Sequence, residues 1–415
     1  MRTAHRAAAA LAAPLLALAC PAATAPAAAD ESPGQCTFPD KPYAGRPWSL
    51  QRVLLDELWK QATGKGVRVA VIDTGVDVKN RQLAGAVDTR SGRNLLPKNL
   101  KDENGNKIER GKENGITDSV GHGTKVAGII AARPMHGTGF TGLAPGATII
   151  PIQQNDAEGH GTAETLAAAI RYAAGPARAD VINISQDTAD AVDPAPELKE
   201  AVDEALAEKT VIVASAGNDG LGGNVKETYP ASYEGVLAVA ASDRNNERAA
   251  FSQSGEFVDV AAPGVDMIST VPGGGHCSDD GTSFSAPYAA GVAALLKEKR
   301  PGWTPRQINA QIMQTAERAI PGHDRLVGWG VVDPVRALTE ADRPIEHPVP
   351  GDDSAGKAKP PSAMTLPTGE TPEEQVSRLG TYVAVGSSVL VAVIAGSAVV
   401  MRDVRRVKRK SRRMS

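Results

Sequence analysis

Three short segments, far apart in the sequence, carry the side chains needed for acyl transfer. Asp73 ends the apolar run VRVAVI, His122 stands between glycines in GHGT, and Ser283 lies in GTSFSAP. A serine hydroxyl is a weak nucleophile at neutral pH unless a neighbouring base takes its proton, and a third group must hold that base and stabilise its charge. Asp73, His122 and Ser283 match the roles of orienting acid, general base and nucleophile.

A fourth residue, Asn218, could stabilise the oxyanion that such a reaction forms. It follows the apolar run TVIVASA, and its carboxamide can donate an N–H alongside the backbone N–H of Ser283, which starts an expected helix. Each motif alone also has a structural explanation, because Asp-Thr-Gly is a common turn, His-Gly a common loop and Gly-Thr-Ser a common helix cap. The four residues together, in the order Asp, His, Asn and Ser, indicate a serine peptidase.

The elements around these residues predict a parallel sheet that brings them together. Apolar runs alternate with amphipathic segments, which is typical of an α/β domain whose sheet is covered on both faces. The carboxyl ends of parallel strands share one edge, where such domains place their active sites. The expected strands are VRVAVI, ATIIPI, DVINIS, TVIVASA, VLAVAA and FVDVAA, and the expected helices cover residues 123–132, 162–173, 195–208, 282–297 and 304–315.

One long segment, residues 86–119, interrupts this alternation. It is polar, glycine-rich and without periodicity, so we expect a surface insertion. Its carboxylates are expected to face solvent and are not assigned as calcium ligands: Asp102, Glu103 and Asp118. Four other histidines lack metal-ligand spacing and are expected in surface loops: His136, His160, His276 and His323. No metal or cofactor is expected.

The first 29 residues have the form of a secretory signal peptide, with two arginines, an apolar run and small residues up to Ala29. Export would place the mature chain in an oxidising compartment. Cys20 could instead mark a lipid-modified terminus, but the leucine of that motif is missing before it. If Cys20 leaves with the signal, Cys36 and Cys277 remain. We expect a disulfide between them, with two free thiols as the alternative.

A second apolar stretch, residues 382–401, contains no charged residue. As a helix it would be about 30 Å long, which matches the hydrocarbon core of a bilayer. The 14 residues after it carry a net charge of +7, and basic flanks stay on the cytoplasmic side, so the catalytic residues would face outward. Because the whole chain carries −3, the part before this tail sums to −10, which argues against nucleic-acid binding.

These observations predict one large domain with accessory segments, within the size that a chain of 415 residues allows. Residues 50–60 of the N-terminal extension are expected to form a helix packed on that domain. The predicted order is a signal peptide (1–29), an N-terminal extension (30–66), a peptidase domain (67–340), a proline-rich linker (341–380), a transmembrane helix (381–401) and a basic cytoplasmic tail (402–415).

The motifs VAVIDTGVD, GHGTKVAGII, ASAGN and GTSFSAPYAAGVAAL closely resemble those of the subtilisin-like peptidases, the subtilases. The resemblance covers residues 66–337. It implies a three-layer sandwich with a mainly parallel central sheet and a triad of Asp73, His122 and Ser283. It also implies that Ser185 and Gly217 bind an extended peptide substrate. The family's order of catalytic residues differs from those of unrelated folds that reach the same triad.

A narrower resemblance, carried by residues 47–77, the linker and the terminal helix, is to the mycosins. These are membrane-anchored subtilases associated with type VII secretion systems. The resemblance implies processing of an exported protein, or support of a secretion complex in which proteolysis is secondary. It further implies an N-terminal extension that wraps the domain in place of a cleaved inhibitory propeptide.

One departure from the subtilase pattern concerns substrate selection. Subtilases usually follow the Asn-x-Ser of their substrate-binding strand with a small, glycine-containing turn, whereas Ser185 is followed here by Gln186 and Asp187. Backbone pairing with an extended peptide can survive this change. Asp187 would either favour a basic residue before the scissile bond or face solvent, and the sequence leaves both readings open.

Overall fold

The computed structural model describes residues 36–99, 101, 110–156, 161–186, 196–223, 226–340, 343–351 and 372–411. The expected signal peptide, most of the expected linker and several residues discussed above lie outside this part of the chain, namely Cys20, Asp102, Glu103, His160 and Asp187. The chain divides into two units, Met1–Gly351 and Asp352–Ser415, which are described separately.

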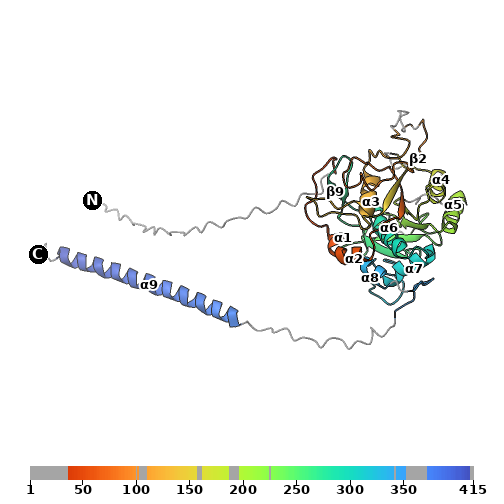
Figure 1. Ribbon diagram of the computed structural model, residues 1–415. Helices are drawn as coiled ribbons and strands as arrows, with labels where there is room; N and C mark the ends of the chain where they lie inside the picture. The colour runs from red at the N-terminus through yellow and green to blue at the C-terminus, as the bar shows by residue number, and fades with distance from the viewer. Residues whose placement is uncertain are drawn as a thin grey trace. The chain divides into compact units, whose positions relative to one another are not determined.

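A seven-stranded sheet of parallel strands forms the centre of the first unit (Figure 1). Its order is β2-β3-β1-β4-β5-β6-β7. The strands are β1 (Arg68–Asp73), β2 (Arg93–Asn94), β3 (Thr148–Gln153), β4 (Val181–Ile184), β5 (Val211–Ser215), β6 (Leu237–Ser242) and β7 (Val260–Pro263). Except for β2, each strand comes from one of the apolar runs that predicted it, and the sheet confirms the expected α/β class.

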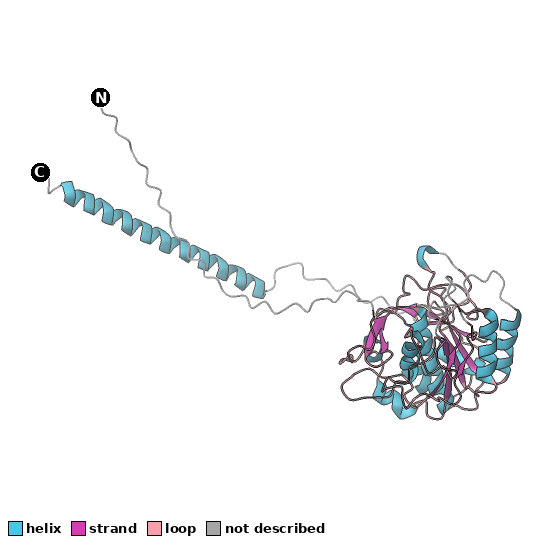
Figure 2. Cartoon of the chain, turned by 90° about the horizontal axis from the view of Figure 1, so that it is seen from above, coloured by secondary structure: helices cyan, strands magenta, loops and turns pink. Residues whose placement is uncertain are grey.

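Helices cover both faces of this sheet, so the unit has three layers (Figure 2). In β1, Val69 and Val71 join a core with the helices of one face, while Ala70 and Ile72 join a second core with those of the other face. This alternation follows from the two-residue repeat of a strand. The first face carries α3 (His122–Ala131), α6 (Thr282–Lys299), α7 (Pro305–Thr315) and α8 (Pro334–Thr339), and the second carries α4 (Ala163–Ala174) and α5 (Pro196–Ala207).

The N-terminal extension packs on the first face, as expected, but as two short helices instead of one. Helix α1 spans Trp48–Gln51 and α2 spans Leu55–Gln61. The chain bends between them at Val53, whose side chain is buried in the first core together with Leu58. Both side chains thus reach the same core across the break between the two helices.

An antiparallel hairpin absent from the sequence-based prediction joins the extension to the domain. It consists of β8 (Met267–Thr270) and β9 (His276–Asp279), and it follows a different periodicity from the buried strands of the main sheet. Cys277 of β9 is bonded to Cys36 with a Cα–Cα distance of 5.8 Å, which confirms the expected disulfide. The bridge fixes the start of the described extension beside the segment that leads to Ser283.

The segment 86–119 is not a simple surface insertion. Asn94 of β2 pairs with Gln153 of β3 in parallel, and its buried side chain donates to Gln153 Oε1 at 2.7 Å. A short 3-10 turn, η1 (Leu221–Gly223), lies elsewhere in the same unit. The sequence-based prediction missed β2 because the segment is polar. Its buried polar groups form hydrogen bonds instead of apolar contacts.

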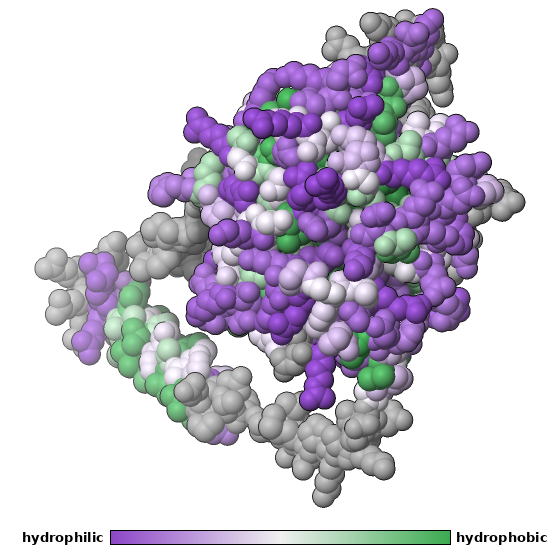
Figure 3. Space-filling model, turned by 45° about the vertical axis from the view of Figure 1, so that its right-hand side comes forward, coloured by the Kyte–Doolittle hydropathy of each residue, from purple (hydrophilic) through white to green (hydrophobic). Residues whose placement is uncertain are grey.

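The second unit contains one long helix, α9 (Pro372–Ser411), which extends beyond the expected limits of 381 and 401 at both ends. Within it, the span Gln375–Arg406 contains an 18-residue window with a mean hydropathy of 2.3, which is apolar enough to cross a membrane. Figure 3 shows its apolar side chains as a green band, in contrast to the largely hydrophilic visible face of the first unit. The additional turns carry polar and charged residues on either side of that band.

Candidate functional site

Asp73 is the last residue of β1, and its side chain is 2% exposed. Its Oδ1 accepts a hydrogen bond from the backbone N–H of Thr74 at 2.7 Å. The first turn of α3 passes so close that a Cβ on Gly123 would lie 3.1 Å from the Cβ of Asp73 and 2.1 Å from the carbonyl oxygen of Gly75. Glycine at position 123 is therefore required for the start of α3 to reach the carboxylate.

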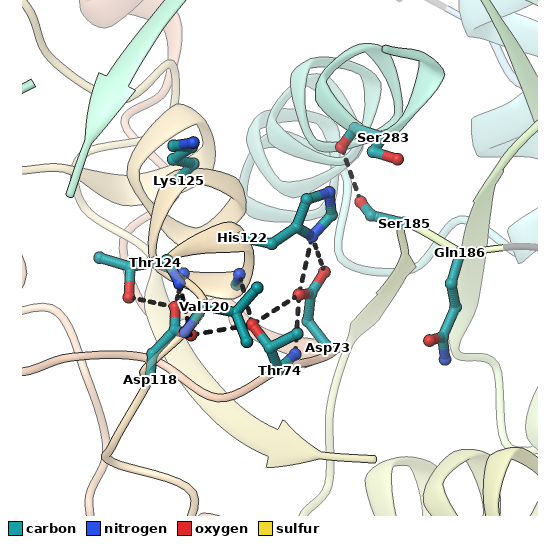
Figure 4. A network of polar contacts seen from close by, with 12 residues as sticks. Asp73, Thr74, Asp118, Val120, His122, Thr124, Lys125, Ser185, Gln186 and Ser283 are labelled. Carbon is teal, nitrogen blue, oxygen red and sulfur yellow. Dashed lines mark hydrogen bonds and ion pairs between the residues drawn. The ribbon is translucent and has the colours of Figure 1, made fainter. Parts of the chain in front are cut away.

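His122 begins α3 and points its ring between Asp73 and Ser283 (Figure 4). Its Nδ1 lies 2.8 and 3.0 Å from the two carboxylate oxygens of Asp73, and its side chain is 29% exposed. Burial lowers the pKa of His122, but the charge of Asp73 and its hydrogen bond outweigh burial and raise the pKa above its ordinary value of 6.5. Because Asp73 can only accept, Nδ1 carries the hydrogen and Nε2 is free to act as a base.

Ser283 occupies the second position of α6, where a backbone N–H has no partner within the helix. Its carbonyl oxygen accepts a hydrogen bond from Ser185 Oγ at 2.8 Å, which ties the helix start to the end of β4. Figure 4 shows the serine on the side of the His122 ring opposite Asp73. The described atoms form no hydrogen bond between Ser283 Oγ and His122 Nε2, a contact that often tightens only when substrate binds.

Asn218 follows β5 and lies against the same helix start. Its Oδ1 accepts hydrogen bonds from the backbone N–H and the hydroxyl of Thr282, both at 2.9 Å. Gly217, with a φ of 99°, donates its N–H to the same hydroxyl at 3.2 Å. These contacts fix the carboxamide with its oxygen inward, so that its N–H groups remain available beside the N–H of Ser283.

The end of β4 is arranged by side-chain contacts. Asn183 Nδ2 donates to Ser185 Oγ at 2.8 Å, so the serine hydroxyl is used within the protein and only its backbone is available to a peptide. Gln186, the departure from the subtilase pattern, donates from Nε2 to Oε1 of Gln154 at the end of β3. A polar pair thus spans β1 next to Asp73, where a glycine-containing turn was the family expectation.

Asp118 contradicts the expectation of a solvated carboxylate. Asp118 is only 7% exposed. It lies beside Thr74, whose hydroxyl oxygen is 2.9 Å from Asp118 Oδ1. Sequence reasoning missed both Asp118 and Thr74, although their proximity to His122 and Asp73 in the sequence was an available signal. Charge and lack of periodicity predict exposure, whereas backbone N–H groups around the following helix start donate hydrogen bonds to this carboxylate.

Three of the other histidines expected in surface loops lie in the described part of the chain. His276 contradicts the surface-loop expectation, because it is 6% exposed in β9, with Nε2 at 2.7 Å from Gln82 Oε1. His323 is half-buried, with Nε2 at 2.7 Å from the carbonyl oxygen of Val258, and His136 is exposed. In the described ranges, no group of three or more His, Cys, Asp or Glu side chains is placed to hold a metal ion.

Sequence comparisons place these residues in a known family. The model of the subtilase family matches residues 64–330. Subtilisin Savinase of Lederbergia lenta is 35% identical over 69% of this chain and 96% of its own length. Thermitase of Thermoactinomyces vulgaris is 36% identical over 68% of this chain and 92% of its own length.

Solved subtilase structures also match this fold, and several of them are mycosins. MycP1 with its N-terminal propeptide removed has a TM-score of 0.62 and 32% identity, covering 73% of this chain and 99% of that one. MycP3 from the type VII ESX-3 secretion system has a TM-score of 0.62 and 33% identity, covering 72% and 90%. MycP1 of Mycobacterium smegmatis has a TM-score of 0.60 and 30% identity, covering 81% and 92%. The family match, the identities and the shared fold together show that this chain belongs to the subtilase family.

Proposed function

We propose that this chain is a membrane-anchored serine endopeptidase that cleaves exported proteins and works with a type VII secretion system. The proposed peptidase activity depends on one observation, the position of His122. Its Nδ1 is hydrogen-bonded to Asp73, and its ring is turned toward Ser283. The subtilase family membership supports the same chemistry. The link to secretion rests on the mycosins, one of which is described as an essential component of the type VII ESX-1 secretion system.

In the proposed reaction, Ser283 Oγ attacks the carbonyl carbon of the scissile peptide bond while His122 Nε2 takes its proton. Asp73 stabilises the imidazolium that forms and holds its tautomer. The oxyanion receives N–H groups from the Ser283 backbone and the Asn218 carboxamide. His122 then returns the proton to the leaving amine, and a water molecule activated by the same imidazole hydrolyses the acyl-enzyme.

The proposed location follows from α9. Its apolar stretch would cross the membrane once, and the basic residues after Met401 would remain on the cytoplasmic side. The first unit would then face outward, where the disulfide between Cys36 and Cys277 is stable.

Labelling with a fluorophosphonate tests the enzymatic proposal. The intact protein should form a covalent adduct, and Ser283→Ala should form none while keeping the thermal unfolding midpoint of the unchanged chain. A folded wild-type sample that is not labelled at Ser283 would contradict an accessible, activated nucleophile.

A second function, bracing of a membrane complex, is favoured by the secretion-system context of the structural neighbours. The same Ser283→Ala variant separates the two functions in cells. If secretion continues while cleavage of exported protein stops, the bracing role is independent of proteolysis. If both stop, proteolysis itself supports secretion.

A further inference from the structure

Asp118 lies beside Thr74 and is held by the backbone around the start of α3 (Figure 4). Its Oδ1 accepts hydrogen bonds from the backbone N–H groups of Val120 at 3.1 Å and Gly121 at 2.8 Å. Its Oδ2 accepts from the backbone N–H of Thr124 at 2.9 Å and from that residue's hydroxyl at 2.6 Å. One carboxylate thus fixes the backbone on both sides of His122.

These contacts determine the charge of Asp118. Both oxygens face N–H and O–H donors, so a proton on either oxygen would meet another hydrogen. Burial, together with the charge of Asp73, raises the pKa of Asp118 above its ordinary value of 3.8, although the hydrogen bonds from Thr124 and Gly121 oppose that increase. The geometry favours the ionised form, since a neutral carboxyl would lose part of this donor set.

Thr74 connects this carboxylate to the catalytic one. Its hydroxyl oxygen accepts the backbone N–H of Gly123 at 3.0 Å, which leaves one hydroxyl hydrogen to donate. That hydrogen has two acceptors, Asp118 Oδ1 at 2.9 Å and Asp73 Oδ1 at 3.2 Å. Figure 4 shows the resulting chain from Asp118 through Thr74 and Asp73 to His122.

We propose that Asp118 is a positioning residue of the active site, which holds His122 and Asp73 in their reactive arrangement and supplies a second negative charge near the imidazole. This inference rests on the proposed peptidase function. Asp118 exchanges no proton in the reaction: the proton moves from Ser283 Oγ to His122 Nε2 and then to the leaving amine. The charge of Asp118 favours the intermediate state in which His122 is cationic.

The charged groups around His122 define the expected pH effect. Asp73 on β1 and Asp118 on the preceding loop both raise its pKa, whereas Lys125 on α3 lowers it. Lys125 also forms an ion pair with Asp279 of β9 at 2.7 Å. Removal of the charge at position 118 should therefore lower the pKa of His122 and move the acidic limb of the kcat/KM profile to lower pH.

The principal test is Asp118→Asn in the full-length protein, with Asp77→Asn as the matched control. Asp77 is equally buried at 7% exposed, but its carboxylate accepts from the backbone of Lys79 and Gly273 and does not contact the triad. We expect Asp118→Asn to reduce kcat by up to about 100-fold with KM nearly constant, as small misplacements of catalytic groups do. The acidic limb should shift to lower pH in this variant alone.

A pair of substitutions at Thr74 keeps the proposal testable if Asp118→Asn does not fold. Thr74→Ser retains the hydroxyl and should keep nearly full kcat, whereas the similarly shaped Thr74→Val removes it and should reduce kcat. Equal activity of the serine and valine variants, with similar thermal unfolding midpoints, would refute the connecting role of this hydroxyl.

An NMR titration of the His122 ring separates failure of this inference from failure of the proposed function. The titration requires no turnover, so it applies even if fluorophosphonate labelling shows an inactive protein. A lower His122 pKa in Asp118→Asn than in Asp77→Asn supports the inference. Equal pKa values in these two variants, or a loss of stability without any change in kcat and pH profile, would overturn it.

Discussion

At the scale of single residues, Asn218 has two ends with different tasks. Its oxygen accepts two hydrogen bonds from Thr282, which leaves its nitrogen to donate to the oxyanion of the proposed reaction. Asn218→Ala should therefore lower kcat by about 100- to 1,000-fold with little change in KM, because the lost donor acts mainly in the transition state. Steady-state kinetics on a peptide substrate measure this split.

Asn218→Asp is the informative companion variant. It keeps an acceptor for Thr282 but replaces the donor with a carboxylate oxygen, so it should be at least as impaired as the alanine variant. Recovery of activity in Asn218→Asp would show that Asn218 acts by positioning Thr282 and not by donating to the oxyanion.

Among the secondary-structure elements, the sequence predicted the strands and helices whose hydrophobic residues recur in a regular pattern. The apolar runs ending near Asp73, Ser185 and Asn218 became parallel strands because runs rich in β-branched residues suit a sheet buried on both faces. The two-residue strand β2 and the β8–β9 hairpin were missed, since neither carries a long apolar pattern. Asp118 was misjudged for a related reason: its burial depends on donors from an adjoining helix start, which local composition does not reveal.

Strand β9 should respond to acid through His276, whose Nδ1 accepts the backbone N–H of Tyr43 at 3.0 Å in the extension. Burial lowers the pKa of His276 from 6.5 to about 4. The unfolded chain therefore binds the extra proton first, and the stability contribution is complete above pH 6.5 and lost as the pH falls toward 4. This shift corresponds to about 3 kcal/mol in the free energy of unfolding.

Denaturant unfolding between pH 7 and pH 4 measures this effect, and His276→Gln is its control. The variant should lose part of the pH dependence below pH 6.5, because glutamine does not titrate. The protection factor of the Tyr43 amide, which compares its exchange rate with the intrinsic rate at the same pH, should also fall in acid as the contact between β9 and the extension breaks. An unchanged pH dependence in the variant would assign the acid response to other groups.

At the scale of the whole molecule, the candidate site and the apolar helix α9 belong to different units of the chain. The extension, both cores and every described residue of the candidate site belong to the first unit, Met1–Gly351. The described side chains of α9 are exposed, including large apolar ones such as Leu390 and Ile394. An exposed apolar helix of this length is costly in water, which is the physical reason to place it in a bilayer.

A chain truncated after Gly351 should therefore keep its peptidase activity and lose its attachment to the membrane. We expect its kcat/KM on a soluble peptide to lie within about twofold of that of the intact protein, since every described residue of the candidate site belongs to the first unit. The intact protein should sediment with membranes in high salt and be released by detergent, whereas the shortened chain should stay in solution. Salt matters here because it removes electrostatic association while leaving apolar insertion intact. If the shortened chain still sedimented with membranes in high salt, the surface of the first unit would have to hold the protein there, and α9 could not be its sole anchor.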